Sequence, residues 1–324
     1  MLGTVIKSDR GFPLVRLEDG RTLRCEHAVA MVKGSEFRAV VGDEVEVTLP
    51  EGHDKGIIER TLPRRTSFVR KDPTERALPQ TLAANFDLVL VAQPIEEVNV
   101  RRLERELVLA HETGAQVVVV LTKADLMESA EELERVRASI DGFIGEDEVM
   151  VITEKDPESL RALEALIAEG NKTAVLIGRS GVGKSSLVNV LVGHELQATT
   201  PVRGRDGKGR HTTVSREIIE LPRGGAIIDM PGVRGLGLWD ADEGIGAAFT
   251  DVESIAQGCR FRDCTHVNEP GCAVRAAVES GELAPNRLDS YLRLREESAT
   301  VKQRREEAER IRTRRGHPRR RSGR

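Results

Sequence analysis

Apolar residues in the middle of the chain come in short unbroken runs, separated by longer segments with helical spacing. FDLVLVAQ, QVVVVLT and EVMVI are such runs. They indicate strands covered on both faces, because such strands lose the alternation of polar and apolar residues. Segments between them, such as RRLERELVLAHETG, place apolar residues three and four positions apart, as an amphipathic helix does. This alternation over residues 86–169 predicts an α/β domain with a mainly parallel sheet.

The first 63 residues have a different pattern. Short strand-like runs are separated by Gly and Asp turns at regular spacing. Such spacing predicts a small β-barrel, and an OB-type fold is the natural candidate. Barrels of this type often bind single-stranded nucleic acid, although aromatic residues make up only 3% of the chain, which weakens any argument from base stacking. A barrel that contacts protein or serves only as a scaffold is the alternative.

Residues 178–185 read GRSGVGKS, which matches the phosphate-loop pattern Gly-x-x-x-x-Gly-Lys-Ser. An apolar run precedes them and the helical segment SSLVNVLVG follows, so the motif has its required strand–loop–helix context. We expect Lys184 to reach the β- and γ-phosphate oxygens and the Ser185 hydroxyl to hold Mg²⁺. The alternative is a glycine-rich turn that contains Lys-Ser by chance. The predicted phosphate-binding residues are Gly178, Arg179, Ser180, Gly181, Val182, Gly183, Lys184, Ser185 and Ser186.

Two segments after the phosphate loop have the composition of nucleotide-sensing switches. GGAIIDMPG predicts a strand that ends at Asp229, which could orient a Mg²⁺-bound water, while the Gly232 N–H could approach the γ-phosphate. Residues 202–217, rich in glycine and cations, predict a mobile loop. A threonine hydroxyl in that loop could complete the Mg²⁺ shell, and Thr213 is favoured over Thr212. The alternative for the loop is a solvated basic segment that touches phosphate or RNA.

Thr122, Lys123, Ala124 and Asp125 form the motif TKAD at the end of a buried run. The Asp125 carboxylate can accept hydrogen bonds from N1–H and the exocyclic amine of guanine, an arrangement that adenine lacks. The Lys123 stem can lie over the base. This base-reading motif precedes the phosphate loop, whereas the usual order is the reverse, so the order predicts a circularly permuted GTP-binding domain. An ATP-using phosphate-loop enzyme is the rival interpretation.

The residue that would orient the attacking water differs from that of many GTPases. Val233 stands after the segment DMPG, where a glutamine is common, and valine cannot form a hydrogen bond through its side chain. Slow intrinsic hydrolysis is therefore expected, accelerated by a partner or by another side chain. His211 is the candidate within the chain for polarising the water. A histidine that only faces phosphate or RNA is the alternative.

Three of the four cysteines lie close together with one histidine. Cys259, Cys264, His266 and Cys272 could form a closed tetrahedral shell for structural Zn²⁺, whereas a disulfide would leave an odd thiol and no role for the histidine. Cys25 stands alone and is predicted to be a small buried hydrophobe. The sequence contains no signal peptide and no apolar run long enough for a membrane, so we expect a reducing, cytoplasmic location.

Charge is distributed unevenly along the chain. The net charge is −4, but residues 301–324 contain eleven Lys or Arg against three Glu, a local charge of +8 that leaves −12 on the rest. Such a tail is suited to salt-sensitive binding of phosphates. A tail that only improves solubility is the alternative. A charged helix over residues 286–310 is expected to connect the cysteine cluster to this tail.

With TKAD, GRSGVGKS, the HTT segment, DMPG and the cysteine cluster in place, nearly the whole chain resembles the circularly permuted ribosome small subunit-dependent GTPase A family. The resemblance implies GTP and GDP as ligands, the small ribosomal subunit and its rRNA as partners, and a role in late subunit maturation. It departs from that family at residues 152–155, where ITEK replaces the Ser-Ala pair that would back the base, and that contact is left unassigned.

The predicted architecture has three parts. They are an OB-type barrel (1–63), a circularly permuted α/β GTPase domain (64–240) and a mainly helical zinc-binding module with a basic tail (241–324). We expect a monomer with no membrane contact. The rival function is an RNA-binding assembly placeholder whose nucleotide site is mainly structural.

Overall fold

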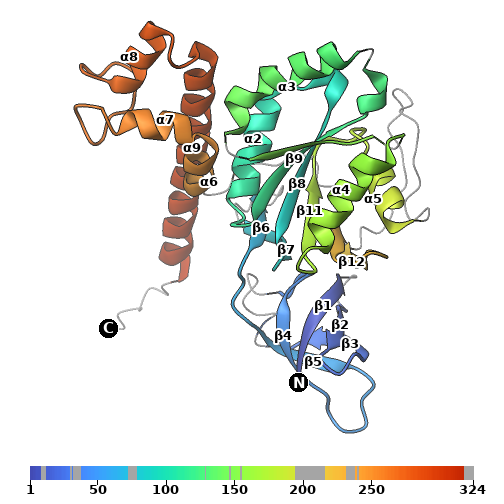
Figure 1. Cartoon of the computed structure of the whole chain (residues 1–324). Helices are drawn as coiled ribbons and strands as arrows, with labels where there is room; N and C mark the ends of the chain where they lie inside the picture. Colours follow the sequence, from blue (N-terminus) through green and yellow to red (C-terminus); the bar gives the residue numbers. More distant parts are fainter. Residues whose placement is uncertain are drawn as a thin grey trace, which may run out of the picture.

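The computed structural model describes the chain except for residues 9–11, 30, 32–37, 72–78, 128, 146, 154, 194–215, 231–237, 239–240 and 317–324 (Figure 1). The described strands form one eleven-stranded sheet and one separate hairpin. One end of the large sheet closes into a barrel, and the other end is the centre of an α/β domain. A helical module packs against the side of that domain.

The barrel is built from five strands of the N-terminal part. Their spatial order is β1 (Leu2–Ser8), β2 (Leu14–Leu17), β3 (Thr22–His27), β5 (Gly56–Thr61) and β4 (Glu44–Thr48). Antiparallel pairing of β4 with β1 closes the ring. Alternate side chains such as Val5, Val15 and Val45 fill its interior. This closed barrel confirms the OB-type prediction.

Cys25 lies in the core of the barrel, as predicted for a small buried hydrophobe. It is fully buried, and this burial raises the pKa of its thiol to about 11. A Cβ added to Gly56 would lie 2.9 Å from the Cys25 sulfur and 2.7 Å from a methyl group of Val47, so the barrel interior has room only for glycine there.

The α/β domain has a six-stranded sheet, and one of its two central strands leads into the phosphate loop. Its order is β10 (Glu148–Val151), β9 (Gln116–Thr122), β8 (Leu88–Pro94), β11 (Thr173–Ile177), β13 (Ala226–Asp229) and β12 (Arg216–Glu220). The first five strands are parallel, and β12 is antiparallel to β13. Strand β8 is buried along its whole length, as its unbroken apolar run predicts.

Helices cover both faces of this sheet (Figure 1). Helices α2 (Val100–His111) and α3 (Ala130–Ile144) share one core with alternate residues of the strands. Helices α4 (Pro157–Ala168) and α5 (Lys184–Val192) share the other core. Because β11 lies between β8 and β13, strands that come before and after the phosphate loop in the sequence flank it in space. This arrangement confirms the permuted α/β prediction.

The barrel is joined to the α/β domain by strand pairing and by a buried ion pair. Strand β1 pairs with β12, and Lys7 forms an ion pair with Glu217 across that junction. Asp43 is fully buried and accepts two hydrogen bonds from the Arg64 guanidinium, at 2.7 and 2.8 Å. A Cβ at Gly42, which has φ +88°, would lie 1.9 Å from the carbonyl oxygen of Ala84, so this close approach requires glycine.

The hairpin β6 (Ser67–Lys71) and β7 (Pro79–Ala84) follows the barrel along the chain. The helical module contains α6 (Asp242–Ala248), α7 (Thr250–Ala256), α8 (Ala273–Ser280) and the long α9 (Pro285–Gly316). Helix α9 confirms the predicted charged helix, and α6 packs against α2 of the α/β domain (Figure 1). None of the helices in the described part of the chain is both long and apolar enough to cross a membrane.

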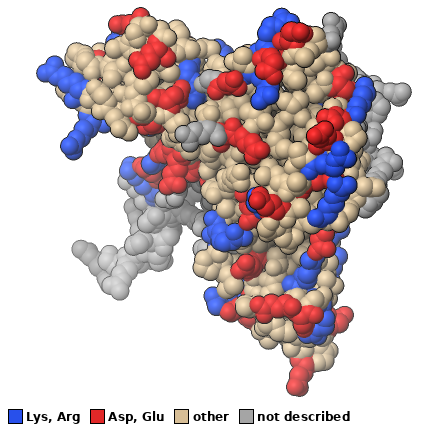
Figure 2. Space-filling view, in the orientation of Figure 1, with Lys and Arg blue, Asp and Glu red and all other residues tan. Residues whose placement is uncertain are grey.

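Surface charges are mixed on the face shown in Figure 2, where Lys and Arg are interspersed with Asp and Glu over all three parts of the chain. Residues 301–316 of the basic tail belong to α9, and residues 317–324 lie outside the described part of the chain. The predicted binding of phosphates by this tail stays a prediction.

Candidate functional site

The phosphate loop connects β11 to α5 and has the backbone geometry that its glycines predict. Gly178 has φ +138°, Gly181 has +86° and Gly183 has +93°, all in the region that favours glycine. A Cβ at Gly178 would lie 2.5 Å from the carbonyl oxygen of Ala92. Helix α5 begins directly after Gly183, so its first N–H groups face the loop. This geometry is suited to holding an anion at a helix N-terminus.

Lys184 closes the loop on itself. Its Nζ donates to the carbonyl oxygens of Gly178, at 2.6 Å, and Arg179, at 2.7 Å. Burial lowers the pKa of the half-buried Lys184, and the nearby Glu106 carboxyl opposes that shift. The ammonium therefore contacts carbonyl oxygens of the loop, and a rotation of the Lys184 side chain could bring it to a bound phosphate. Ser185 follows in the first turn of α5 and is half-buried.

The TKAD motif is tied directly to the phosphate loop. The buried Thr122 hydroxyl, at the end of β9, donates to the carbonyl oxygen of Val182 at 2.6 Å, and the carbonyl oxygen of Gln93 lies 3.2 Å away. The next residue, Lys123, has φ +61° and turns the chain out of the strand. The structure thus brings together two motifs that are far apart in the sequence, at the carboxyl ends of the parallel strands β9 and β11 on either side of β8.

Two residues that the sequence left unassigned hold the Asp125 carboxylate. The Thr153 hydroxyl donates to Oδ1 at 3.0 Å, and Lys155 Nζ lies 2.9 Å from Oδ2. These hydrogen bonds, first from Lys155 and then from Thr153, lower the pKa of Asp125, so its carboxylate is ionised at neutral pH. Within ITEK, only the threonine hydroxyl at position 153 could have indicated this contact, because it can donate a hydrogen bond as the expected serine would. Lys155 is 74% exposed and can leave when a base binds.

The predicted switch residues are described only in part. Strand β13 ends at Asp229 beside β11, which puts its backbone at the same sheet edge as the phosphate loop. The side chain of Asp229 lies outside what the structure describes, as do the remaining predicted switch and catalytic residues, namely His211, Thr212, Thr213, Gly232 and Val233. Their roles therefore stay predictions.

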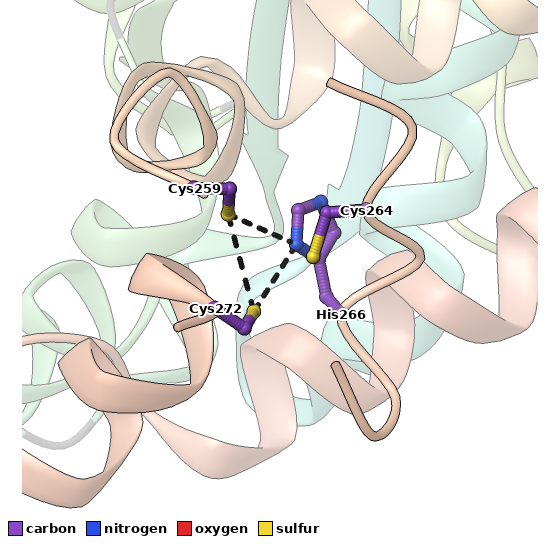
Figure 3. Close-up of side chains that lie close together, drawn as sticks. All are labelled: Cys259, Cys264, His266 and Cys272. Carbon is purple, nitrogen blue, oxygen red and sulfur yellow. Dashed lines mark hydrogen bonds between the residues drawn. The ribbon is translucent and has the colours of Figure 1, made fainter. Parts of the chain in front are cut away.

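The predicted cysteine cluster is brought together in the helical module (Figure 3). The ligand atoms of Cys259, Cys264, His266 and Cys272 all lie within 4.8 Å of one another. The His266 Nδ1 is 3.4 Å from the Cys272 sulfur and 3.6 Å from the Cys259 sulfur, while these two sulfurs are 4.0 Å apart. Four such donors converging on one point can hold a metal ion, and three thiolates with one imidazole are a donor set that a tetrahedral ion accepts.

A carboxylate that the sequence did not indicate shapes the turn between His266 and Cys272. Glu269 accepts hydrogen bonds from the N–H groups of Thr265 at 2.9 Å and of Val267 at 3.1 Å. The hydrogen bonds from Thr265 are the main reason that the pKa of Glu269 falls to about 2. Together with the positive φ of His266, +62°, this turn aims the imidazole at the cysteines.

Comparison with known proteins gives one consistent result. The RsgA GTPase family matches residues 61–239. A protein of Streptomyces avermitilis, called Small ribosomal subunit biogenesis GTPase RsgA, is 42% identical over 302 residues, which is 93% of this chain and 80% of that protein. A protein of the same name from Xanthomonas euvesicatoria pv. vesicatoria is 44% identical over 268 residues, 82% of this chain and 71% of the relative.

Two solved structures are similar to this chain. YjeQ from Thermotoga maritima has a TM-score of 0.68 at 26% identity, with 92% of this chain and 98% of YjeQ covered. YloQ, described as a circularly permuted GTPase, has a TM-score of 0.64 at 28% identity, with 94% and 95% covered.

Proposed function

This chain belongs to the RsgA GTPase family, and from that premise we propose that it hydrolyses GTP to GDP and phosphate as a maturation factor of the small ribosomal subunit. The observation that carries the proposal is the hydrogen bond from Thr122 to Val182, which joins a guanine-reading motif to a phosphate loop. The names of the relatives support the ribosomal role. Neither motif alone specifies a GTPase, whereas the two together do.

Within this function, the phosphate loop binds and orients the nucleotide. Backbone N–H groups of residues 178–186 surround the phosphates, and Lys184 leaves the carbonyl oxygens of Gly178 and Arg179 for the β- and γ-phosphate oxygens. Mg²⁺, when bound, neutralises charge that develops between those phosphates. Ser185 and Thr213 are the residues proposed to hold it, with Asp229 orienting a water of its shell. The Gly232 N–H is proposed to sense the γ-phosphate.

The base is read by the TKAD segment and by the loop that follows β10. Asp125 accepts hydrogen bonds from guanine, with Thr153 fixing one of its oxygens, and the Lys123 stem covers the base. Because Lys155 occupies the second Asp125 oxygen in the structure, guanine must displace it on binding.

GTP hydrolysis is proposed to need groups that the phosphate loop does not supply. Val233 cannot orient water, so turnover is proposed to rise when the small subunit is bound, with His211 as the residue of this chain that polarises the water. The barrel (1–63) and the basic tail are proposed to contact rRNA, on either side of the GTPase domain (64–240). The chain is proposed to act in the cytoplasm as a monomer.

The cysteine cluster is proposed to hold one structural Zn²⁺ within the module formed by residues 241–324. Three thiolates and one imidazole saturate a tetrahedral shell and leave no open position for catalysis. The segment between α7 and α8 consists of turns without a helix or strand, so the ion would fix this connection.

Nucleotide specificity tests the proposal. Asp125→Asn exchanges an acceptor for a donor, so it is expected to weaken GTP binding and to allow xanthosine triphosphate to bind in its place. Binding of both nucleotides is measured for the parent chain and the variant, with Asp19→Asn as a control that makes the same change at an exposed acid of the barrel. Unchanged preference in Asp125→Asn, or ATP binding as tight as GTP binding in the parent chain, contradicts the proposal.

A further inference from the structure

Two of the four residues of the cysteine cluster are placed by helices, and two are not. Cys259 follows α7 closely, and Cys272 is the N-cap of α8, where its sulfur accepts a hydrogen bond from the Arg275 N–H at 3.5 Å. Cys264 and His266 lie in the turns between these helices. Contacts other than those of regular secondary structure must therefore fix the second pair.

The Glu269 carboxylate supplies such contacts around His266. Its Oε1 accepts hydrogen bonds from the N–H of Thr265, at 2.9 Å, and from the hydroxyl of the same residue. Its Oε2 accepts from the N–H groups of Val267 and Asn268, each at 3.1 Å. Because Thr265 and Val267 are the two neighbours of His266, one carboxylate holds the main chain on both sides of this residue. Both oxygens accept from the loop, which makes Glu269 a support of the cluster rather than one of its ligands.

The conformation of His266 requires support of this kind. Its φ of +62° lies in the left-handed region, which a residue with a side chain occupies only where its surroundings fix it. In this conformation the buried imidazole presents Nδ1 to the cluster, 3.4 Å from the Cys272 sulfur and 3.6 Å from the Cys259 sulfur (Figure 3). Nδ1 is the ring nitrogen nearer to the main chain. Binding a metal through Nδ1 therefore requires the main chain to lie closer to the ion than binding through Nε2 does.

We propose that Glu269 is a positioning residue of the metal centre: by holding the N–H groups on both sides of His266, it selects Nδ1 rather than Nε2 as the nitrogen that binds the ion. This inference rests on the proposed Zn²⁺ site, because it requires an ion among the four donors. Residues that orient a metal ligand without touching the metal contribute about ten- to a hundredfold to metal affinity. Without the carboxylate, the turn at His266 relaxes, the main chain moves away from the ion, and the longer reach of Nε2 becomes the better fit.

Zinc affinity and the identity of the bound nitrogen test this inference in the whole chain. Affinity is measured by competition with a chromophoric chelator, and the bound nitrogen is found from the ¹⁵N chemical shifts of the histidine that changes on zinc loading. Glu269→Gln keeps the size of the side chain but has one acceptor oxygen instead of two, so it cannot hold both neighbours of His266. We expect zinc binding to weaken about tenfold or more. We also expect a signal of histidine bound through Nε2 to appear in this variant, whereas the parent chain shows Nδ1 alone.

Two further variants separate positioning from effects of charge and of folding. Asp263→Asn removes the same charge from an exposed acid in the same segment, next to Cys264, and should bind zinc as the parent chain does. Thr265→Val removes one of the four hydrogen bonds and leaves the carboxylate in place. It should weaken zinc binding about two- to fivefold, and it keeps the test decisive if Glu269→Gln does not fold.

Three results overturn the inference and leave the proposed metal site intact. The first is zinc bound through Nε2 in the parent chain. The second is unchanged affinity in Glu269→Gln, or in Thr265→Val where the first variant is unfolded, or Nδ1 as the only bound nitrogen of Glu269→Gln. The third is an equal loss of affinity in Asp263→Asn. A parent chain that binds no zinc overturns the proposed site, and this inference with it.

Discussion

Replacement of Arg287 should weaken the attachment of the helical module to the GTPase domain. The Arg287 side chain is 3% exposed although it carries a charge. It donates to Glu104 Oε1 at 3.1 Å, to both oxygens of Asp251 at 2.9 Å and to the carbonyl oxygen of Ala248 at 2.7 Å. Its guanidinium also lies 3.9 Å from the centre of the Phe249 ring. Because Glu104 belongs to α2 and Arg287 to α9, this contact joins the two parts of the chain.

The magnitude follows from what the substitution leaves behind. In Arg287→Met, the fully buried side chain of Glu104 loses its charged partner among the described residues, and its Oε2 has no hydrogen-bond partner among them. Breaking a buried pair on one side costs about 3–5 kcal/mol, because an uncompensated charge stays in the interior. Asp251 is 39% exposed and can be hydrated instead, so Glu104 dominates the loss. Adding Glu104→Gln to Arg287→Met removes that charge and should recover most of the lost free energy.

Native-state hydrogen exchange of the α9 and α6 amides measures the local free energy of opening, which suits a chain of several domains better than one global unfolding curve. Arg295→Met is the matched control on the same helix, because Arg295 is 53% exposed and lies 3.8 Å from Glu253, so about 1 kcal/mol or less is expected. Equal exchange in Arg287→Met and Arg295→Met, or no recovery in the double variant, would show that the Arg287–Glu104 pair does not hold the module in place.

Three other substitutions test separate parts of the site. Thr122→Val removes the hydroxyl that donates to the Val182 carbonyl oxygen, and it should weaken GDP binding about fivefold, a loss of about 1 kcal/mol. Thr66→Val removes a similar hydrogen bond to the Phe86 carbonyl oxygen, far from the loop, and should leave GDP affinity unchanged. Fluorescence titrations measure both affinities. Gly178→Ala should abolish GDP binding because its Cβ meets Ala92 O at 2.5 Å, while Gly170→Ala, at another positive φ with open space, should bind normally. Cys264→Ser should lower the bound metal, found by elemental analysis, from one ion to none per chain, and Cys25→Ser should retain it; equal metal content in both contradicts the assignment.

Much of the fold was predictable from the sequence because its signals are local. The unbroken apolar run of β8, the turn-separated strands of the barrel and the strand–loop–helix context of the phosphate loop each lie within a few residues of one another. The cysteine cluster was predictable for the same reason, since Cys259 and Cys272 are close in sequence and their chemistry allows few partners.

Side chains that act across the fold were not predictable. Thr153 and Lys155 meet Asp125 only because β10 pairs with β9, and no periodicity in the sequence marks that contact. Glu106 and Glu104 stand on an amphipathic helix where charged residues are expected at the surface, and only the packing of α2 against the sheet and α9 buries them. The sequence alone therefore does not distinguish a buried carboxyl from a solvated one.

Turnover of GTP by the whole chain can be titrated separately with small ribosomal subunits, large subunits and assembled ribosomes. We expect slow hydrolysis by the chain alone and multiple turnovers that are at least about tenfold faster with small subunits, equivalent to about 1.4 kcal/mol of transition-state stabilisation. Large subunits should give no such increase. Hydrolysis that is indifferent to small subunits, or stimulated equally by large ones, contradicts a GTPase that the small subunit activates and favours an assembly placeholder whose nucleotide site is mainly structural.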